Sequence, residues 1–133
     1  MKAFSLKIVT PDALIYDGMA ESLLVRTGSG DVEILAGHAD LIASVATGRV
    51  RIRTESGERI AAASGGFLSV TGGAVSLVCT TFEFGENIDL ARAERAKENA
   101  EAAIQSRGSD ADLDRLRAKL QRALTRIHVG SER

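Results

Sequence analysis

The spacing of apolar residues changes once along this chain, near residue 86. Before that point apolar residues alternate with polar ones or form short runs between glycines, as Phe4, Leu6 and Ile8 do near the start. From residue 87 onward they recur every three or four positions. A period of two is typical of half-buried strands, and a period near 3.6 is typical of amphipathic helices. The sequence therefore predicts a two-part α+β protein, with strands in residues 1–85 and helices in residues 86–133.

Short apolar runs separated by turn residues fill the first part. The runs cover residues 14–16, 22–27, 41–45, 50–54, 60–63, 67–71 and 74–82. Between them lie residues that tolerate turn conformations: Pro11-Asp12, Asp17-Gly18, Gly28-Ser29-Gly30, Gly48, Ser56-Gly57, Gly65-Gly66 and Gly72-Gly73. Many short strands with frequent turns and no helical pattern between them predict an antiparallel β-sandwich or a flattened barrel.

The second part predicts a helix that begins near Asn87, a favourable N-cap residue, with Asp89 complementing the positive end of the helix dipole. Gly108 is expected to end this helix. Its apolar side is narrow and mostly alanine, so another helix can approach closely. The residues on that side are Ile88, Ala93, Ala96, Ala100, Ala103 and Ile104.

A second helix is expected to start at Ser109 and Asp112, which resemble a capping box. Two helices joined by about three residues should fold antiparallel. The second helix carries a continuous apolar stripe of Leu113, Leu116, Leu120, Leu124 and Ile127. It also carries a separate basic row of Arg115, Lys119, Arg122 and Arg126.

This helical hairpin is expected to be marginally stable alone. Five aliphatic side chains and an alanine face bury little surface against the entropy of ordering two helices. An element of this kind depends on a docking surface and can exchange it for another of similar quality. The sequence thus suggests a mobile regulatory element. The basic row fits either a solvated helix face or contact with an acidic partner surface.

Composition argues against several functional classes. The net charge of −1 provides no global field to attract nucleic acid or an anionic membrane. Cys79 is the only cysteine, which excludes an internal disulfide and fits a reducing cytosol. Residues 1–10 alternate like a strand, so neither a signal peptide nor a membrane span is expected there. We expect no nucleic-acid partner and no direct membrane insertion.

No set of residues predicts catalysis or a metal site. His38 and His128 are the only histidines, too few for the usual three or four metal ligands. Gly37-His38 is expected to form a turn before the run at 41–45, and His128 to be a cation near a helix end or a solvated side chain. No serine lies in G-x-S-x-G, and Cys79 in an apolar strand is expected to be an inert buried thiol.

Four segments together indicate a family. They are "IVTPDALIYDGMAESLLVRTGSGD" at 8–31, "ILAGHADLIASVATGRVRI" at 34–52, "SGGFLSV" at 64–70 and "IDLARAERAKENAE" at 88–101. In order and spacing they resemble the epsilon subunits of bacterial F-type ATP synthases, over essentially the whole chain. That family usually has proline where this chain has Ala36 and Asp40, and glycine where it has Glu33. The intervening loop is therefore expected to be less rigid than in typical members.

The resemblance implies a ten-stranded sandwich that binds the gamma subunit and rests on the c-ring, as part of the rotating central stalk. It implies a non-catalytic, peripheral protein on the cytoplasmic face of the bacterial plasma membrane. The hairpin would swing from a compact state to an extended one that reaches the alpha and beta subunits and restrains ATP hydrolysis. The expected partner-facing residues are Gly37, His38, Arg115, Lys119, Arg122 and Arg126, the four cations suiting an acidic segment of beta.

The resemblance also implies a regulatory ATP site at the start of the first helix. ATP-binding members carry an Ile-Asp-x-x-Arg-Ala motif there, and Asn99 stands where they carry arginine. Loss of that cation makes the expected binding weak. The matching residues are Ile88, Asp89, Arg92 and Ala93, with Arg122 and Arg126 approaching the phosphates from the second helix.

A different class of function also fits the residues. A stand-alone β-sandwich could serve as an adaptor, with the hairpin as a fixed oligomerisation device. The two interpretations predict different partners. The synthase subunit would form a stable complex with a gamma-like coiled coil, whereas the adaptor would only self-associate.

Overall fold

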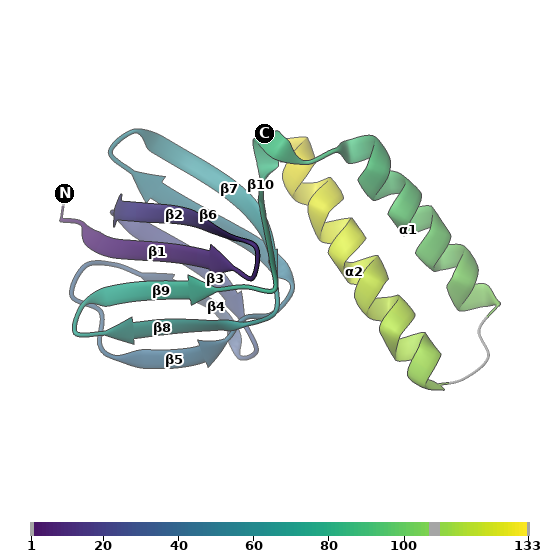
Figure 1. Cartoon of the computed structure of the whole chain (residues 1–133), viewed down its shortest axis with the longest axis horizontal. Helices are drawn as coiled ribbons and strands as arrows, with labels where there is room; N and C mark the ends of the chain where they lie inside the picture. The colour runs from purple at the N-terminus through teal and green to yellow at the C-terminus, as the bar shows by residue number, and fades with distance from the viewer. Residues whose placement is uncertain (1, 107–109, 133) are drawn as a thin grey trace.

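The computed structural model describes residues 2–106 and 110–132, which form two five-stranded sheets packed face to face and a helical hairpin beside them (Figure 1). The first sheet has the order β2-β1-β9-β8-β5 and the second β10-β7-β6-β3-β4. The predicted sandwich followed by two helices is confirmed. The strands are β1 (Phe4–Thr10), β2 (Ala13–Ala20), β3 (Ser22–Thr27), β4 (Gly30–Ile34), β5 (Leu41–Ser44), β6 (Gly48–Thr54), β7 (Gly57–Ser64), β8 (Phe67–Thr71), β9 (Ala74–Val78) and β10 (Thr81–Phe84).

The main core lies between the two sheets. Along β1 and β6 buried residues alternate with more exposed ones, and the side chains of Leu6, Leu23 and Leu77 are fully excluded from solvent. Among the described strand pairs, β1 and β9 run parallel and the others antiparallel. The alternation read from the sequence therefore corresponds to the pleat of a sheet with one face on the core.

Two turn predictions are wrong. Asp17-Gly18 lies inside β2, paired with β1, and Gly48 begins β6, opposite Ala63 of β7. At both places hydrogen bonds to a neighbouring strand override the local preference for a turn. β4 was not predicted, because only two of its residues, Val32 and Ile34, are apolar and they form no apolar run.

The apolar run at residues 74–82 belongs to two strands rather than one. β9 ends in the first sheet, and β10 begins in the second sheet after Cys79 and Thr80 cross between them. The crossing passes close to Gly66, which has a φ of +99°, and a Cβ there would lie 1.8 Å from the carbonyl oxygen of Val78. Periodicity alone does not reveal that a chain leaves one sheet for the other, because both segments remain extended.

The outer faces of the two sheets differ in chemistry. On the second sheet, arginines of β6 pair with carboxylates of other strands, as Arg51 does at 3.1 Å with Glu33 of β4, across the intervening β3. On the first sheet, exposed or half-buried apolar side chains gather instead. We call this surface the apolar face, formed by Val9, Leu14, Met19, Ile42, Phe67 and Val78.

The helices follow a short 3₁₀ turn, η1 (Gly85–Asn87), at the end of β10. α1 (Leu90–Gln105) and α2 (Asp110–Glu132) lie side by side and antiparallel (Figure 1). The carboxylate of Asp89 accepts a hydrogen bond from the backbone N–H of Arg92 at 3.1 Å, so Asp89 is the N-cap and the prediction of Asn87 is wrong. The expected helix stop at Gly108 and the capping Ser109 lie outside the described residues.

The apolar stripe of α2 is not its most buried surface. Leu124 is 39% exposed, and the other four residues of the stripe are only half-buried. On the adjoining face Ala123 and Val129 are buried. α2 contacts β6, β7 and η1, so the surface that docks on the sandwich is made by small residues rather than by the leucines.

Candidate functional site

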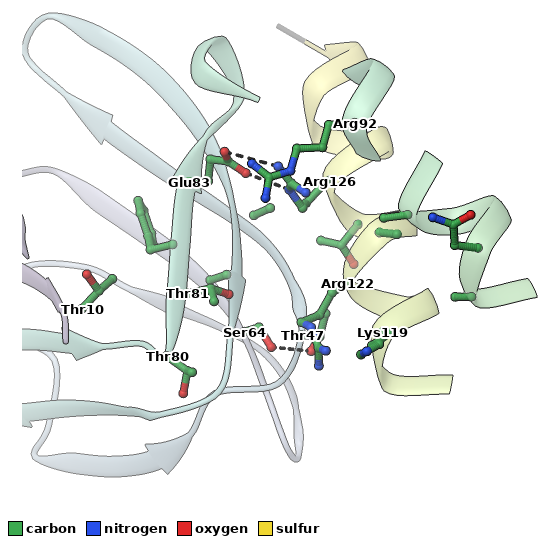
Figure 2. A pocket seen from close by; sticks show the side chains of 18 of the residues that line it. Thr10, Thr47, Ser64, Thr80, Thr81, Glu83, Arg92, Lys119, Arg122 and Arg126 are labelled. Carbon is green, nitrogen blue, oxygen red and sulfur yellow. Dashed lines mark hydrogen bonds and ion pairs between the residues drawn. The ribbon is translucent and has the colours of Figure 1, made fainter. Parts of the chain in front are cut away.

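A cleft of about 730 Å³ lies between the second sheet and the helical hairpin. Its walls come from β7 and β10 on one side and from both helices on the other (Figure 2). Small side chains leave the space open, because Ala62 lies on the sandwich side and Ala96 and Ala100 lie on α1. Larger side chains at these positions would occupy part of the cleft.

One end of the cleft, which we call the glutamate end, contains a salt bridge between the two walls. The Nε of Arg126 on α2 donates to Oε1 of Glu83 on β10 at 2.8 Å, and its Nη2 lies 3.5 Å from Oε2. Arg92 of α1 lies beside this pair (Figure 2). The pair is half-buried, so it is less screened than a fully exposed one.

The other end, which we call the hydroxyl end, combines cations with neutral hydroxyls. Arg122 and Lys119 of α2 point toward Thr47 and Ser64, whose hydroxyls are 2.9 Å apart (Figure 2). Thr80 and Thr81 add hydroxyls along the same wall. Among the described residues, neither Lys119 nor Arg122 forms an ion pair.

A small apolar cluster and further charged contacts hold the hairpin on the sandwich. Ala62, Ile88 and Val129 are buried together, with Ile60 and Leu90 packed around them. Within the hairpin, α2 approaches the start of α1 so closely that a Cβ on residue 130, a glycine, would lie 2.7 Å from Cδ2 of Leu90. The helix end is also tied down electrostatically, since Nη2 of Arg49 on β6 lies 2.9 Å from Oε2 of Glu132.

The linker η1 is anchored separately. The Arg59 guanidinium of β7 lies 3.5 Å from the centroid of the Phe84 ring and pairs with the carboxylate of Glu86. The hydrogen bond from Arg59 lowers the pKa of Glu86 from its ordinary value. These contacts fix the linker to the sandwich.

The structure brings together part of the predicted ATP site. Arg92, Arg122 and Arg126 all line the cleft, as does Asn99. Asp89 caps α1, while Ile88 and Ala93 are buried and do not line the cleft.

The predicted partner-facing residues are divided. Lys119, Arg122 and Arg126 line the cleft, whereas Arg115 is exposed outside it and pairs with Asp112 of its own helix at 3.4 Å. Gly37 and His38 form the expected turn in the loop between β4 and β5, away from the cleft lining.

Sequence reasoning missed the contributions of the sandwich to the cleft, namely Glu83 and the hydroxyls. The sequence did contain a signal for Glu83, since it is a charged residue between two aromatic ones, Phe82 and Phe84, on a strand. Thr47 and Ser64 gave none, since their proximity depends on the pairing of β6 with β7.

Cys79 and His128 lie where the sequence predicts, one buried and the other exposed near a helix end. Cys79 is buried, and burial raises the pKa of its thiol to about 11, so it is inert at neutral pH. His128 is well exposed and lies 2.8 Å from Glu132 of the same helix. Within residues 2–106 and 110–132 there is no cluster of three metal-ligating side chains, and neither helix is long and apolar enough to cross a membrane.

The chain belongs to the class of two-part proteins in which a β-sandwich is followed by a helical hairpin, here closed over a basic cleft. Residues 3–85 match the family model described as "ATP synthase, Delta/Epsilon chain, beta-sandwich domain", and residues 86–130 match "ATP synthase, Delta/Epsilon chain, long alpha-helix domain". The chain belongs to this ATP synthase delta/epsilon family, whose epsilon chains are non-catalytic subunits of the complex.

Relatives support this membership over the full length. The chain is 40% identical over 129 residues to the "ATP synthase epsilon chain" of Bacillus velezensis, covering 97% of this chain and 98% of that one. It is 37% identical over 134 residues to the chain of the same name from Ruminococcus albus, with both chains fully covered. The match in both parts favours the synthase interpretation over a stand-alone adaptor.

Solved structures share the fold. A chain in the cryo-EM structure of the Euglena gracilis mitochondrial ATP synthase, OSCP/F1/c-ring in rotational state 1, has a TM-score of 0.79 at 26% identity, covering 90% of this chain and 76% of that one. A chain in the Tetrahymena thermophila mitochondrial ATP synthase central stalk/c-ring structure has a TM-score of 0.63 at 14% identity, covering 96% and 93%. At this low identity, the similarity to the second structure shows only that the fold is shared.

Shortening Val129 should loosen the hairpin without unfolding the sandwich. In Val129→Ala the lost methyl groups leave a gap beside Ala62 and Ile88, which we expect to weaken docking by about 1–3 kcal/mol. Hydrogen exchange should become faster in α1 and α2 while β-strand amides keep their protection. The control Leu124→Ala, which removes a partly exposed side chain from the groove between the helices, should change docking less. Equal loss of protection in strands and helices would show that the two parts unfold as one unit.

Proposed function

We propose that this chain is a central-stalk subunit of a bacterial F-type ATP synthase, which helps to couple ion translocation to ATP synthesis. The full-length match to epsilon chains, in both the sandwich and the hairpin, carries this proposal. Its place is on the cytoplasmic face of the plasma membrane, held peripherally through other subunits. The sandwich is the part suited to this mechanical task, since its core is continuous and fully buried.

The apolar face of the first sheet is the proposed docking surface for the gamma subunit. Leu14 and Met19 are each 57% exposed, Phe67 is 46% exposed and Ile42 is 78% exposed. Exposed apolar side chains gathered on one sheet mark an interaction surface. The hairpin covers the opposite sheet, so this face remains available whichever posture the helices adopt.

The loop between β4 and β5 is the proposed contact with the c-ring. Leu35 is 51% exposed there, beside Gly37 and His38. The backbone N–H of His38 donates to the carbonyl of Leu35 at 3.2 Å. Asp40, at a position where the family usually has proline, accepts a hydrogen bond from the N–H of Gly72 at 3.0 Å. Hydrogen bonds thus shape this loop in the absence of prolines.

The hairpin is the proposed regulatory part, which restrains ATP hydrolysis when it extends toward the alpha and beta subunits. Its contact with the sandwich is small, consisting of one apolar cluster and the pairs Arg126–Glu83 and Arg49–Glu132. When the hairpin leaves the sandwich, Arg126 loses its pairing with Glu83. It is then available, together with Arg115, Lys119 and Arg122 of the same helix, as one basic row. Such a row suits an acidic surface.

Weak binding of ATP to the docked posture is also proposed. Arg92, Arg122 and Arg126 converge on the cleft, which supplies positive charge for a triphosphate. Arg126 is already paired with Glu83, and Asn99 contributes no charge, so affinity should be low. ATP would then bridge α1, α2 and the sandwich.

Charges placed on the apolar face should prevent assembly. Ile42→Glu with Phe67→Glu buries two unpaired carboxylates against gamma, and we expect affinity to fall by at least about tenfold. Co-purification with the gamma subunit measures this loss. Leu124→Glu, an equivalent change on the hairpin, should leave the complex intact. Normal recovery of gamma with the double variant would contradict the proposed docking face.

Removing the hairpin should release inhibition. A chain lacking residues 87–133 keeps all ten strands, so it should assemble normally and raise ATP hydrolysis by the complex. Arg115→Ala should act in the same direction but less strongly, and its effect should shrink at high salt. Arg115 is preferred to Arg126 because Arg126 also holds the docked posture. Unchanged hydrolysis after truncation would refute the regulatory role.

ATP should bind the isolated protein in the millimolar range. Calorimetric titration measures this, and Arg92→Ala should weaken binding by about tenfold through loss of a charge-assisted bond. Arg117→Ala, on an exposed helix position outside the cleft, is the matched control and should have no effect. If millimolar ATP produces no heat, the proposed ATP site is wrong and Asp89 serves only as the N-cap of α1.

A further inference from the structure

We propose that Arg59 is a positioning residue for the helical hairpin. By holding the linker η1 on β7, its side chain fixes the surface on which the end of α2 docks. The described partners of its guanidinium, Phe84 of β10 and Glu86 of η1, belong to neither α1 nor α2. The inference concerns the docked posture, and it rests on the proposed regulatory role only for its effect on ATP hydrolysis.

The guanidinium of Arg59 joins the linker to the sandwich core. Its Nε donates to Oε1 of Glu86 at 3.1 Å, and its Nη2 pairs with the same carboxylate. Its central carbon lies 3.5 Å from the centroid of the Phe84 ring, a cation–π distance. Phe84 belongs to the buried core and meets Phe82 edge to face, with 5.2 Å between the ring centroids. One side chain thus ties the residues that follow β10 to the core of the sandwich.

The linker that Arg59 holds is in direct contact with α2. Gly85 lies between β7 and α2, where a Cβ would be 3.2 Å from the carbonyl oxygen of Val129 and 3.4 Å from Cγ1 of Ile60. The backbone N–H of Ile88 donates to the carbonyl of Gly85 at 3.2 Å, and Ile88 then packs in the buried cluster with Val129. A shift of η1 would therefore move both the surface under α2 and one member of the docking cluster.

Holding η1 also shortens the tether that carries the hairpin. With η1 fixed, Ile88 and Asp89 alone separate it from the first residue of α1, and both have extended backbone conformations. Without the contacts of Arg59, the free segment would also include residues 85–87. A short tether keeps a docking element at a high effective concentration near its site, and a longer flexible one lowers that concentration. Loss of Arg59 should thus weaken docking while the contacts made by the helices themselves stay available.

Hydrogen exchange of the full-length protein measures the effect on docking. In Arg59→Ala we expect amides of α1 and α2 to exchange about threefold faster, the scale of one exposed charged contact, while amides of β1, β6 and β9 keep their rates.

The matched control is Arg53→Ala, which removes the same charge from the adjacent strand β6. The Arg53 side chain is 42% exposed, against 44% for Arg59, and its Nη2 lies 3.7 Å from Oε2 of Glu58. The control should leave helix exchange unchanged. Equal helix exchange in Arg59→Ala and Arg53→Ala would overturn the proposal.

A double-mutant cycle separates this role from a general loss of stability. Glu86→Gln keeps the shape of an exposed side chain but removes its charge, so it should also accelerate helix exchange. Combined with Arg59→Ala it should be no worse than Arg59→Ala alone, because that change already breaks the contact. Additive effects, or equal acceleration in strands and helices, would show that Arg59 acts by other means and would contradict the inference.

Gly85 tests the docking surface directly. Gly85→Ala places a methyl group 3.2 Å from the carbonyl oxygen of Val129 while the contacts of Arg59 stay intact, so helix exchange should again accelerate. Unchanged exchange would mean that η1 does not support α2, and the inference would be wrong.

The assembled complex distinguishes this inference from the proposed regulatory role. If the extended hairpin restrains hydrolysis, weakened docking in Arg59→Ala should lower ATP hydrolysis by the complex, whereas Arg53→Ala should not change it. Faster helix exchange with unchanged hydrolysis would support the positioning role of Arg59 and contradict the regulatory role of the hairpin. Unchanged helix exchange contradicts the positioning role at any rate of hydrolysis.

Discussion

The contact between the last turns of α2 and strand β7 determines how the rest of the molecule can work. It closes the cleft, pairs Arg126 with Glu83 and leaves the apolar face uncovered on the opposite sheet. This contact is possible because β7 has small residues on both faces. Ala61 and Ala63 pack into the sandwich core, while Ala62 receives Val129 from outside. A larger residue at position 62 would hold the helix away from the sheet.

The free energy that docks the hairpin is much smaller than the free energy that stabilises the sandwich core. Full burial of Ile88 and Val129 stabilises docking by about 1.5–3 kcal/mol each, and the half-exposed ion pairs add about 0–1 kcal/mol each. The sandwich core, by contrast, buries residues from nearly every strand. A partner that favours the extended posture by about 5.5 kcal/mol could invert a 99:1 preference for docking. The proposed change of hairpin posture would therefore leave the sandwich folded, with the linker held by the contacts of Arg59 with Phe84 and Glu86.

The sequence was most informative where a signal is local. The change of apolar period predicted the sandwich and the hairpin, and three of the four cations predicted as a row on α2 line one cleft, while Arg115 lies outside it. It was misleading where strand pairing decides the outcome, as at Asp17-Gly18 and Gly48. The hydroxyl pair of Thr47 and Ser64 is separated by 17 residues in sequence, and only the register of β6 with β7 joins them. Residues that are brought together by strand pairing have no characteristic separation in sequence, so a site of this kind cannot be predicted from spacing.

The cations of α2 would be used differently in the docked posture and in the proposed extended one. Docking pairs Arg126 with Glu83, whereas Lys119 and Arg122 line the same cleft without an ion pair to any described residue. A ligand that binds only the docked posture stabilises it by RT ln(1 + [L]/Kd), which amounts to about 1.4 kcal/mol when the ligand is at ten times its dissociation constant. That is comparable with one buried side chain of the docking cluster. An anion in the cleft would therefore shift the balance between postures by a graded amount, whereas the larger change needed to invert it must come from contacts made by the extended helices.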